Sequence, residues 1–368
     1  MKIECLKDKL KEAVGLAEHL AGKNLSLPIL SSVLLEEKDN VLHIRSTNLD
    51  VGFEIALPAK SDSNGRFAVN ASVLGNFLNN LGAEDKVVIE EVKGNLKIST
   101  KKTSAVIKCY PADDFPLIPT VAEGEEFSFP AKDLAYGLKS VIYASSLSDI
   151  KPEIASVYLY QNDGQMVFVA TDSFRLAEKR LNIIGKSFQI EPIIIPFKNA
   201  VEIVRVFENL NEIVNIRDDK NQISFFADNI HLVSRLIDGQ FPDYRQIMPK
   251  QFKTEVSVKR EDITNALKLS TIFTDRFNQV GLKIDPLTKT IQLNSSNQDV
   301  GENSVTIEAE EVRGEAVEVS FNAKYMMDCF QSITSGSFWL KFNEKNRPLF
   351  ISGSGDDSFR YIVMPINR

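Results

Sequence analysis

Short runs that alternate apolar and polar residues recur along the whole chain and predict β-strands. The clearest runs lie at Phe67–Val69, Val87–Ile89, Leu96–Ile98, Val167–Val169 and Phe350–Ile351. Between the runs, longer stretches repeat apolar residues at steps of three and four, which is typical of amphipathic helices. Residues 6–20 and 132–143 show this helical pattern most clearly. The pattern predicts an α+β protein in which single helices are separated by several strands.

The strand-to-helix pattern itself repeats at nearly even intervals. Six similar starts lie at residues 3, 67, 127, 193, 256 and 319, with spacings of 64, 60, 66, 63 and 63 residues. Four of them place Asn or Pro just before the helix, as in FAVNASVLGNFL (67–78) and FSFPAKDLAYGL (127–138). Asn caps a first helical turn, and Pro has no N–H to leave unpaired there. We interpret the chain as six repeats, with an irregular α+β protein as the alternative.

Pairs of repeats make three domains of a favoured size, about 125 residues each. Two segments have the composition of extended connectors: PADDFPLIPTVAEGEE (111–126), rich in Pro and acid, and GQFPDYRQIMPKQFK (239–253), with two prolines and a glycine. The predicted domains therefore span residues 1–124, 125–251 and 252–368.

Composition indicates a cytoplasmic globular protein. Apolar residues make up 43% of the chain and charged residues 25%, and no apolar run is long enough to cross a membrane. The N-terminus becomes charged at once and lacks the apolar centre of a signal peptide. Cys5, Cys109 and Cys329 are odd in number and far apart, which suggests reduced thiols.

No catalytic constellation emerges from the sequence. His19, His43 and His231 have no Cys or His at metal-ligand spacing. The chain also lacks a G-x-S-x-G elbow and a G-x-x-x-x-G-K-[ST] phosphate loop. We therefore expect no enzyme activity, no metal and no cofactor.

The charge distribution is uneven. The net charge of −7 argues against a protein that grips DNA tightly over its whole surface. Predicted helices nevertheless carry many cations: Lys7, Lys9, Lys11, Lys132, Lys139, Lys198, Arg205, Lys259, Arg260, Lys268 and Lys324. If all helices faced one way, that face would be the more basic one. A solvated face of mixed charge is the alternative, because the helices also contain acids.

Several blocks of sequence resemble the bacterial sliding clamp family, the β subunit of the replicative DNA polymerase III. They occur in order over the whole chain: SLPILSSVLLE (26–36), STNLDVGFEIALPA (46–59), YPADDFPLIP (110–119), ATDSFRLA (170–177), FPDYRQIMP (241–249), FNAKYMMD (321–328) and YIVMPINR (361–368).

The resemblance implies three similar clamp domains, each with two strand–helix–strands repeats, helices inside and antiparallel sheets outside. Two chains would close head to tail into a six-domain homodimeric ring around duplex DNA. Such a ring holds DNA by topology, so weak contacts that are independent of sequence suffice. The implied function is a processivity factor that tethers the DNA polymerase III catalytic subunit and other replication and repair proteins, after a clamp loader has placed it. The alternative is a clamp-like peptide-binding scaffold that does not encircle DNA.

The resemblance also implies a pocket for a short Gln- and Leu/Phe-containing peptide of these partners. Matched to the family motifs, its residues are Ile154, Thr171, Ser173, Phe174, Arg175, Leu176, Pro242, Ile247, Asn322, Tyr325, Ile362, Met364, Pro365 and Ile366. Leu176, Ile247, Ile362 and Met364 would accept apolar side chains, while Thr171 and Arg175 would orient polar groups at the rim.

Some positions depart from the family pattern. Ser173 and Phe174 stand where members often have Gly and His, and Ile366-Asn367-Arg368 replaces a frequent Met-Arg-Leu ending. Asn24 stands where an arginine thought to touch DNA is often found. DNA contacts are expected from Lys23, Asn24, Lys151, Lys198 and Arg205.

The dimer joint is expected to join the first domain to the third. Lys101 and Lys102 on one side and Glu308, Glu310 and Glu311 on the other offer opposite charges. Ile107 and Ile272 are expected to form the apolar centre of this joint.

Overall fold

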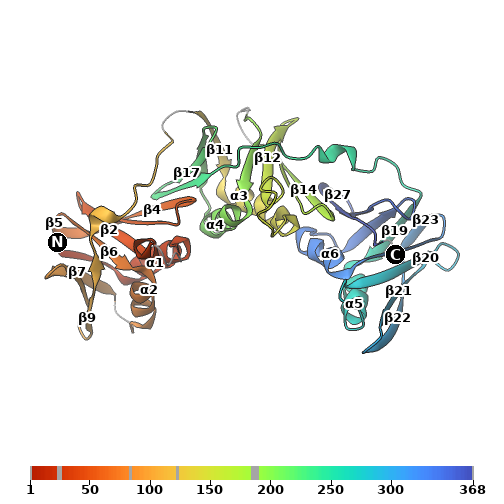
Figure 1. Ribbon diagram of the computed structural model, residues 1–368, viewed down its shortest axis with the longest axis horizontal. Helices are drawn as coiled ribbons and strands as arrows, with labels where there is room; N and C mark the ends of the chain where they lie inside the picture. The colour runs from red at the N-terminus through yellow and green to blue at the C-terminus, as the bar shows by residue number, and fades with distance from the viewer. Residues whose placement is uncertain (1, 23–26, 83–84, 122–123, 184–189, 367–368) are drawn as a thin grey trace. The chain divides into compact units, whose positions relative to one another are not determined.

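A computed structural model describes residues 2–22, 27–82, 85–121, 124–183 and 190–366 (Figure 1). The chain divides into two compact units: residues 1–135 with 201–238, and residues 136–200 with 239–368. Neither unit coincides with one predicted domain, so the boundaries after residues 124 and 251 stay a prediction.

The α-helices begin at the predicted intervals. In the described residues they are α1 (Lys7–Leu20), α2 (Ala71–Asn80), α3 (Ala131–Val141), α4 (Phe197–Phe207), α5 (Arg260–Thr271) and α6 (Ala323–Asp328). Each begins four residues after one of the six repeat starts identified in the sequence. The repeat is therefore confirmed as six strand-to-helix steps.

Local chemistry explains where two of these helices begin. The side chain of Asn70 accepts a hydrogen bond from the N–H of Val73 at 3.0 Å and caps α2. Asn322 accepts from the N–H groups of Lys324 and Tyr325, at 2.9 and 3.1 Å, and caps α6. Both contacts satisfy donors that a helix start leaves without an intrahelical partner.

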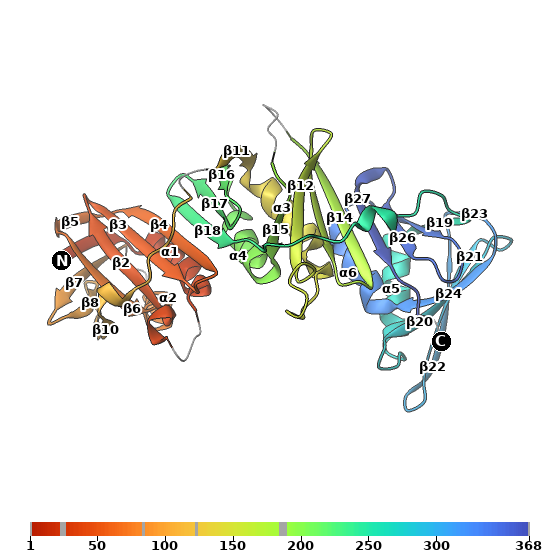
Figure 2. The ribbon, with the colours of Figure 1, turned by 45° about the horizontal axis from the view of Figure 1, so that its top comes forward.

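The first unit contains two antiparallel sheets. In the described residues the strand orders are β5-β1-β7-β8-β9 and β10-β6-β2-β3-β4-β18-β17-β16-β11. The larger sheet is continuous because β4 pairs with β18, for example Phe53 with Leu232 (Figure 2). The strands are β1 (Lys2–Leu6), β2 (Ser32–Lys38), β3 (Val41–Thr47), β4 (Val51–Pro58), β5 (Lys60–Ser63), β6 (Gly65–Asn70), β7 (Lys86–Val92), β8 (Asn95–Ser99), β9 (Ser104–Ile107), β10 (Cys109–Tyr110), β11 (Glu125–Pro130), β16 (Ile213–Asp218), β17 (Gln222–Ala227) and β18 (Ile230–Arg235).

Helix α1 packs beside α2 and against β3 and β4 (Figure 1). It buries Leu10, Ala13, Val14, Ala17 and Leu20, which share one helical face. The charged residues of α1 lie outside this buried face, as expected of an amphipathic helix.

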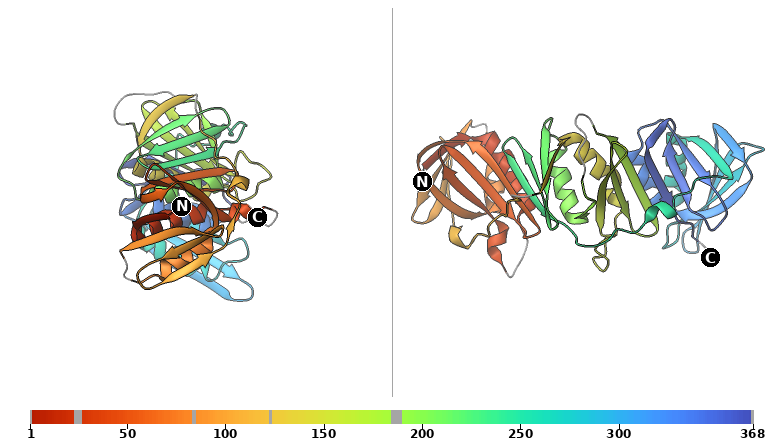
Figure 3. Two further views of the ribbon diagram at one scale, coloured as in Figure 1. Left: turned by 90° about the vertical axis from the view of Figure 1, so that its left-hand side faces the viewer. Right: turned by 90° about the horizontal axis from the view of Figure 1, so that it is seen from above.

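The second unit also contains two antiparallel sheets. In the described residues their orders are β15-β12-β13-β14-β27-β26-β25-β19-β23 and β22-β21-β20-β24. The larger sheet is continuous because β14 pairs with β27, which places the yellow-green strands beside the blue ones (Figure 3). The strands are β12 (Ser156–Asn162), β13 (Gln165–Thr171), β14 (Arg175–Asn182), β15 (Ile193–Pro196), β19 (Thr254–Lys259), β20 (Gln279–Asp285), β21 (Thr290–Asn297), β22 (Gly301–Glu308), β23 (Glu311–Gly314), β24 (Val317–Asn322), β25 (Ser337–Phe342), β26 (Leu349–Gly353) and β27 (Asp356–Val363).

Short 3-10 turns complete the element order of the described chain. They are η1 (Pro28–Ser31), η2 (Ala112–Asp114), η3 (Ile142–Ala144), η4 (Tyr244–Gln246) and η5 (Cys329–Ser332). The η4 turn lies in the connector that the sequence analysis placed at residues 239–253.

Candidate functional site: a partner-peptide surface on the second unit

The turn between β13 and β14 is held by its own side chains. The hydroxyl of Thr171 donates to the carbonyl of Arg175 at 2.7 Å and accepts from the N–H of Ser173 at 3.1 Å. One carboxylate oxygen of Asp172 accepts from the N–H groups of Phe174 and Arg175, both at 2.9 Å. Ser173 has a φ of 77°, a left-handed conformation that glycine adopts without strain. The hydroxyl of Thr171 therefore stabilises the turn through hydrogen bonds within it.

Arg175 ties this turn to α6. Its guanidinium donates to Asp172, with an Nε–Oδ2 distance of 3.0 Å, and to Asp328 at the end of the helix. It also stacks over the ring of Tyr325, with the Cζ atom 4.3 Å from the ring centroid. The side chain is only 11% exposed, so it lies in an ion-pair network rather than free at a rim.

The charge of Arg175 is stabilised in this setting. Burial opposes the charge, but the neighbouring Tyr361, Asp172 and Asp328 outweigh burial and raise the pKa of Arg175. Burial also raises the pKa of Tyr361, whose hydroxyl donates to the carbonyl of Tyr325 at 2.8 Å. The network stays cationic at its centre over the physiological pH range.

Strand alternation separates Arg175 from the apolar candidates. Successive side chains of a strand point to opposite faces, so Leu176 lies on the face of β14 opposite Arg175. Leu176 is paired with Ile362 across β14 and β27, and both are 1% exposed. The N–H of Met364 donates to the carbonyl of Phe174 at 2.8 Å, which continues the pairing beyond the strand end.

Exposed apolar side chains lie at the strand ends beside this buried pair and on the connector. Phe174 is 62% exposed and Met364 is 37% exposed. Ile247, which is 51% exposed, follows the η4 turn, and its N–H donates to the carbonyl of Tyr244 at 3.1 Å. An apolar surface is thus available to a partner, and Leu176 and Ile362 form its base.

The other predicted pocket residues belong to neighbouring segments of the second unit. The carbonyl of Pro242 accepts from the N–H of Tyr244, and the amide of Asn322 donates to the carbonyl of Phe277. The N–H of Ile154 donates to the carbonyl of Lys151. Pro365 and Ile366 are partly buried, and the N–H of Ile366 donates to the carbonyl of Ser320 at 2.8 Å. These contacts do not by themselves place Ile154, Pro242 or Asn322 against Leu176.

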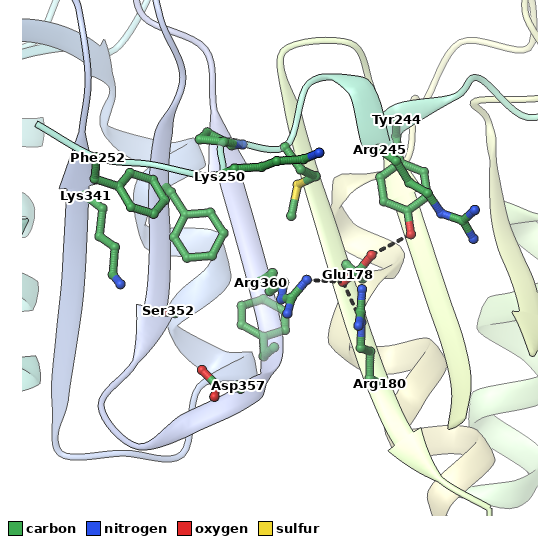
Figure 4. Close-up of a pocket in the computed structure, with 14 residues that line it drawn as sticks. Glu178, Arg180, Tyr244, Arg245, Lys250, Phe252, Lys341, Ser352, Asp357 and Arg360 are labelled. Carbon is green, nitrogen blue, oxygen red and sulfur yellow. Dashed lines mark hydrogen bonds and ion pairs between the residues drawn. The ribbon is translucent and has the colours of Figure 1, made fainter. Parts of the chain in front are cut away.

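A second cluster, centred on Glu178, anchors the connector to β14 (Figure 4). The hydroxyl of Tyr244 donates to Glu178 at 2.5 Å and lies 2.8 Å from the hydroxyl of Tyr160. Arg180 donates to the other oxygen of Glu178 at 2.8 Å, and Arg360 lies 3.7 Å from that oxygen. Burial and Glu178 together raise the pKa of Tyr244, so the phenol remains a proton donor. This cluster fixes the segment that carries Pro242 and Ile247.

The residues that organise these contacts were not predicted from the sequence. Asp172, Glu178, Tyr244 and Asp328 were not among the predicted site residues, although each lies within a matched block or, for Glu178, one residue beyond it. Glu178 could have been found from strand alternation, because residues two apart in a strand lie on one face of the sheet, here the face of Leu176. Nothing local indicates that Asp328 pairs with a residue 153 positions earlier.

Three of the predicted DNA contacts lie on described residues. Lys151 is exposed. Lys198 in α4 pairs with Asp149 at 3.0 Å, with both side chains 75% exposed. Arg205 pairs with Glu202 one helical turn away. Lys23 and Asn24 lie outside the described residues, so the structure places neither of them.

The predicted joint residues lie at or near two sheet edges. Strand β9 of the first unit and strand β22 of the second are outermost in their sheets in the described chain. Lys101 and Lys102 are exposed just before β9, and Glu308 and Glu310 are exposed at the end of β22 and just after it. Ile272, after α5, is 62% exposed. Ile107 is only 8% exposed and faces its own core, whereas its neighbour Val106 is 58% exposed.

The described part of the chain holds no group of three His, Cys, Asp or Glu side chains that is close enough to bind a metal ion. Among the helices of these residues, none is long and apolar enough to cross a membrane.

Comparisons with known proteins match the whole length of the chain. Family models for the DNA polymerase III beta subunit match in order: the N-terminal domain at residues 1–119, the central domain at 128–243 and the C-terminal domain at 245–367. The chain is 25% identical over 372 residues to the beta sliding clamp of Synechococcus elongatus, which covers 100% of this chain and 99% of the relative. It is 26% identical over 388 residues to that of Synechocystis, with the same coverage.

Solved structures agree with these matches. The DNA polymerase III beta subunit of Thermotoga maritima superposes with a TM-score of 0.94 at 26% identity, covering 100% of this chain and 99% of that one. The DNA polymerase sliding clamp of Bacillus subtilis has the same fold, with a TM-score of 0.94, 23% identity and the same coverage. The three-domain α+β fold is confirmed by these superpositions. With three consecutive family models matched over nearly its entire length, the chain belongs to the DNA polymerase III beta subunit family, the family of the beta sliding clamps.

Proposed function

We propose that the protein is a DNA sliding clamp, a homodimeric ring that encircles duplex DNA and tethers a replicative polymerase to its template. The observation that carries this proposal is that β9 and β22 are both outermost strands of their sheets in the described residues, and exposed side chains of opposite charge flank them. Exposed edges pair readily with other chains, and natural proteins usually cover or blunt them. Strand β22, GENSVTIE, has neither proline nor lysine to block such pairing.

The two edges complement each other. Lys101 and Lys102 flank β9, while Glu308 and Glu310 flank the end of β22. Val106 and Ile272 are exposed apolar side chains near these edges. A β9 edge of one chain that pairs with the β22 edge of another chain makes a heterologous contact, and two such contacts between two chains close a ring. The second unit's β22 would thus pair with the β9 of another copy.

A ring would explain why a DNA-binding protein carries a net charge of −7. A closed ring retains DNA by topology and needs only weak contacts to phosphates, so strong binding would slow its sliding. Lys151, Lys198 and Arg205 are proposed as such contacts, together with Lys23 and Asn24. As an accessory subunit the protein would contribute attachment and no catalysis of its own.

Partners are proposed to dock on the apolar surface around Leu176 and Ile362. Burying two or three apolar anchors stabilises a complex by about 1.5–3 kcal/mol each, before association costs of several kcal/mol. Micromolar affinity follows, on the order of −8 kcal/mol, which suits partners that exchange. The DNA polymerase III catalytic subunit, a clamp loader, other polymerases and repair proteins are the proposed partners.

Met364→Ala is expected to weaken binding of a short peptide containing Gln, Leu and Phe by about 5- to 30-fold, because about 1–2 kcal/mol of apolar contact is lost. Fluorescence anisotropy with the labelled peptide measures this loss. Leu147→Ala is the control, since Leu147 is an 81% exposed residue of the same unit outside the proposed surface. Equal affinities for both variants would remove Met364 from the pocket.

The ring itself is tested by native mass and by retention on DNA. A clamp stays on nicked circular DNA and slides off linear DNA. Release from both at the same rate would contradict the topological mechanism, and a persistent monomer would favour a scaffold that does not encircle DNA.

A further inference from the structure

A concave hollow of about 490 Å³ lies on the second unit beside the Glu178 cluster (Figure 4). The connector forms one wall with Arg245, Met248 and Lys250, and strands β14, β25, β26 and β27 form the others. The volume falls within the range of ligand-binding pockets, about 300–1,000 Å³. The hollow adjoins the apolar surface around Leu176 and Ile362, because Phe350 of its lining is the cross-strand partner of Ile362. Its lining contains neither Leu176 nor Ile362, so it extends the surface available to a partner.

The hollow is electropositive in an acidic protein. Its described lining includes five cations, Arg180, Arg245, Lys250, Lys341 and Arg360, and two carboxylates, Glu178 and Asp357. The chain as a whole carries −7. A concave site lined by one sign of charge focuses its field and attracts groups of the opposite sign. The excess of cations therefore indicates an anionic occupant.

Internal pairing leaves some of this positive charge available. Glu178 takes up Arg180 and, at 3.7 Å, Arg360, and Lys341 pairs with Glu255 at 3.0 Å. Arg245 stacks on Tyr160, with Cζ 4.9 Å from the ring centroid, and no carboxylate of the described residues neutralises its charge. Lys250 is exposed and likewise makes no ion pair within the described residues. Lys250 and Arg245 thus offer charge on the connector wall.

The hollow also offers apolar contact. Phe252 and Phe350 form a tilted pair, with their ring centroids 5.3 Å apart, and both are partly exposed. Met248 lines the wall beside them. Aromatic rings and a flexible methionine side chain suit an aliphatic or aromatic side chain of a partner.

We propose that this hollow binds an acidic segment of a partner protein, in which Asp or Glu residues alternate with apolar ones. Its carboxylates would lie against Lys250, Arg245 and Arg360, and an apolar side chain would lie on Phe252 and Phe350. Charge-assisted hydrogen bonds from arginine to carboxylate are among the stronger polar contacts. The inference does not depend on a closed ring.

The two carboxylates of the lining favour a peptide over a nucleic acid. A nucleic-acid strand carries a negative charge on every nucleotide and would bring phosphates near the exposed Asp357. A peptide can place a neutral residue at that position and keep its acids opposite the cations. An acidic peptide therefore fits the charge pattern better.

The test uses a short labelled peptide in which Asp and Glu alternate with Phe and Leu, titrated with the full chain by fluorescence anisotropy. Lys250→Glu is expected to weaken binding about tenfold and Lys250→Met about threefold, because the first reverses a charge and the second removes it. Lys250→Arg should bind like the natural chain. Lys220→Glu is the matched control, since Lys220 is an exposed lysine of the first unit.

Four results would overturn the proposal. They are failure of the natural chain to bind the acidic peptide, equal weakening by Lys220→Glu, equal binding of a peptide with Asn and Gln in place of the acids, and displacement of the peptide by oligothymidylate. The last would assign the hollow to single-stranded nucleic acid. Native mass and retention on circular DNA should stay unchanged in Lys250→Glu, which separates this test from the test of the ring.

Discussion

Ile272→Asp is expected to convert the protein from a dimer of about 82 kDa, twice the 41.2 kDa chain, into a monomer. Ile272 is 62% exposed after α5, so aspartate leaves the fold of the unit intact. In a closed ring the residue occurs at both joints. Losing about 1.5–3 kcal/mol of burial at each joint, besides the cost of burying a charge, weakens closure by more than about 100-fold.

Static light scattering near micromolar concentration measures this change. Val106→Asp tests the other side of the same joint, because Val106 is 58% exposed on β9. Leu117→Asp is the control, since Leu117 is 96% exposed on the connector at residues 111–126. Dimers in both Val106→Asp and Ile272→Asp would place the joint elsewhere, whereas a monomeric natural chain would contradict the ring.

The sequence predicted the repeat because its signals are local. The helix starts depend on short apolar periodicity and on residues such as Asn70 and Asn322, which cap through contacts within three residues. Such signals do not depend on the rest of the fold. They located the six helices of the described chain, and pairing of the repeats predicted three domains. The resemblance added helices on the inside, sheets on the outside and a ring of two chains.

The joining of strands between distant repeats was not predictable in the same way. β4 pairs with β18, and β14 pairs with β27, across more than 170 residues of sequence. Pairing over such distances depends on which edges are left open once each repeat has folded. No short pattern in either strand encodes that choice.

In the candidate site, too, the identity of residues was predictable from the sequence, whereas their orientation was not. Resemblance identified Leu176, Ile362 and Met364, and the structure brings these three together. It did not reveal that Arg175 points to the opposite face and is held by Asp172 and Asp328. For the joint, it selected Ile107, whereas the side chain exposed on β9 belongs to Val106. Orientation requires the strand register, which the sequence alone does not supply.

Arg175→Met is expected to lower the free energy of unfolding by about 3 kcal/mol, the lower end of the cost of breaking a buried ion pair. The substitution keeps an unbranched apolar stem but leaves Asp172, only 13% exposed, without its cation. The 41% exposure of Asp328 limits the loss, because water solvates that carboxylate. Chemical denaturation measures the change.

Arg66→Met provides the matched control for this loss. Arg66 pairs with Asp113 on the surface of the first unit, with side chains 51% and 80% exposed. Exposed pairs contribute about 0–1 kcal/mol, so this variant should unfold nearly like the natural chain. Equal stability of Arg175→Met and Arg66→Met would show that the Arg175 network does not hold the turn to α6.

Peptide binding then distinguishes a positioning role from direct contact. If Arg175 acts by holding the turn, Arg175→Lys should be more stable than Arg175→Met but should not restore the position of the turn against α6. Lysine keeps the positive charge but lacks the planar fork that meets two carboxylates and stacks on Tyr325. Affinity for the Gln-, Leu- and Phe-containing peptide should then fall together with stability across Arg175→Lys and Arg175→Met. A loss of affinity without a loss of stability would instead mean that the guanidinium reaches the partner itself, as the family resemblance first suggested. The buried ion pairs favour the positioning role, since a guanidinium that is fixed by Asp172 and Asp328 and is only 11% exposed offers little surface to a peptide.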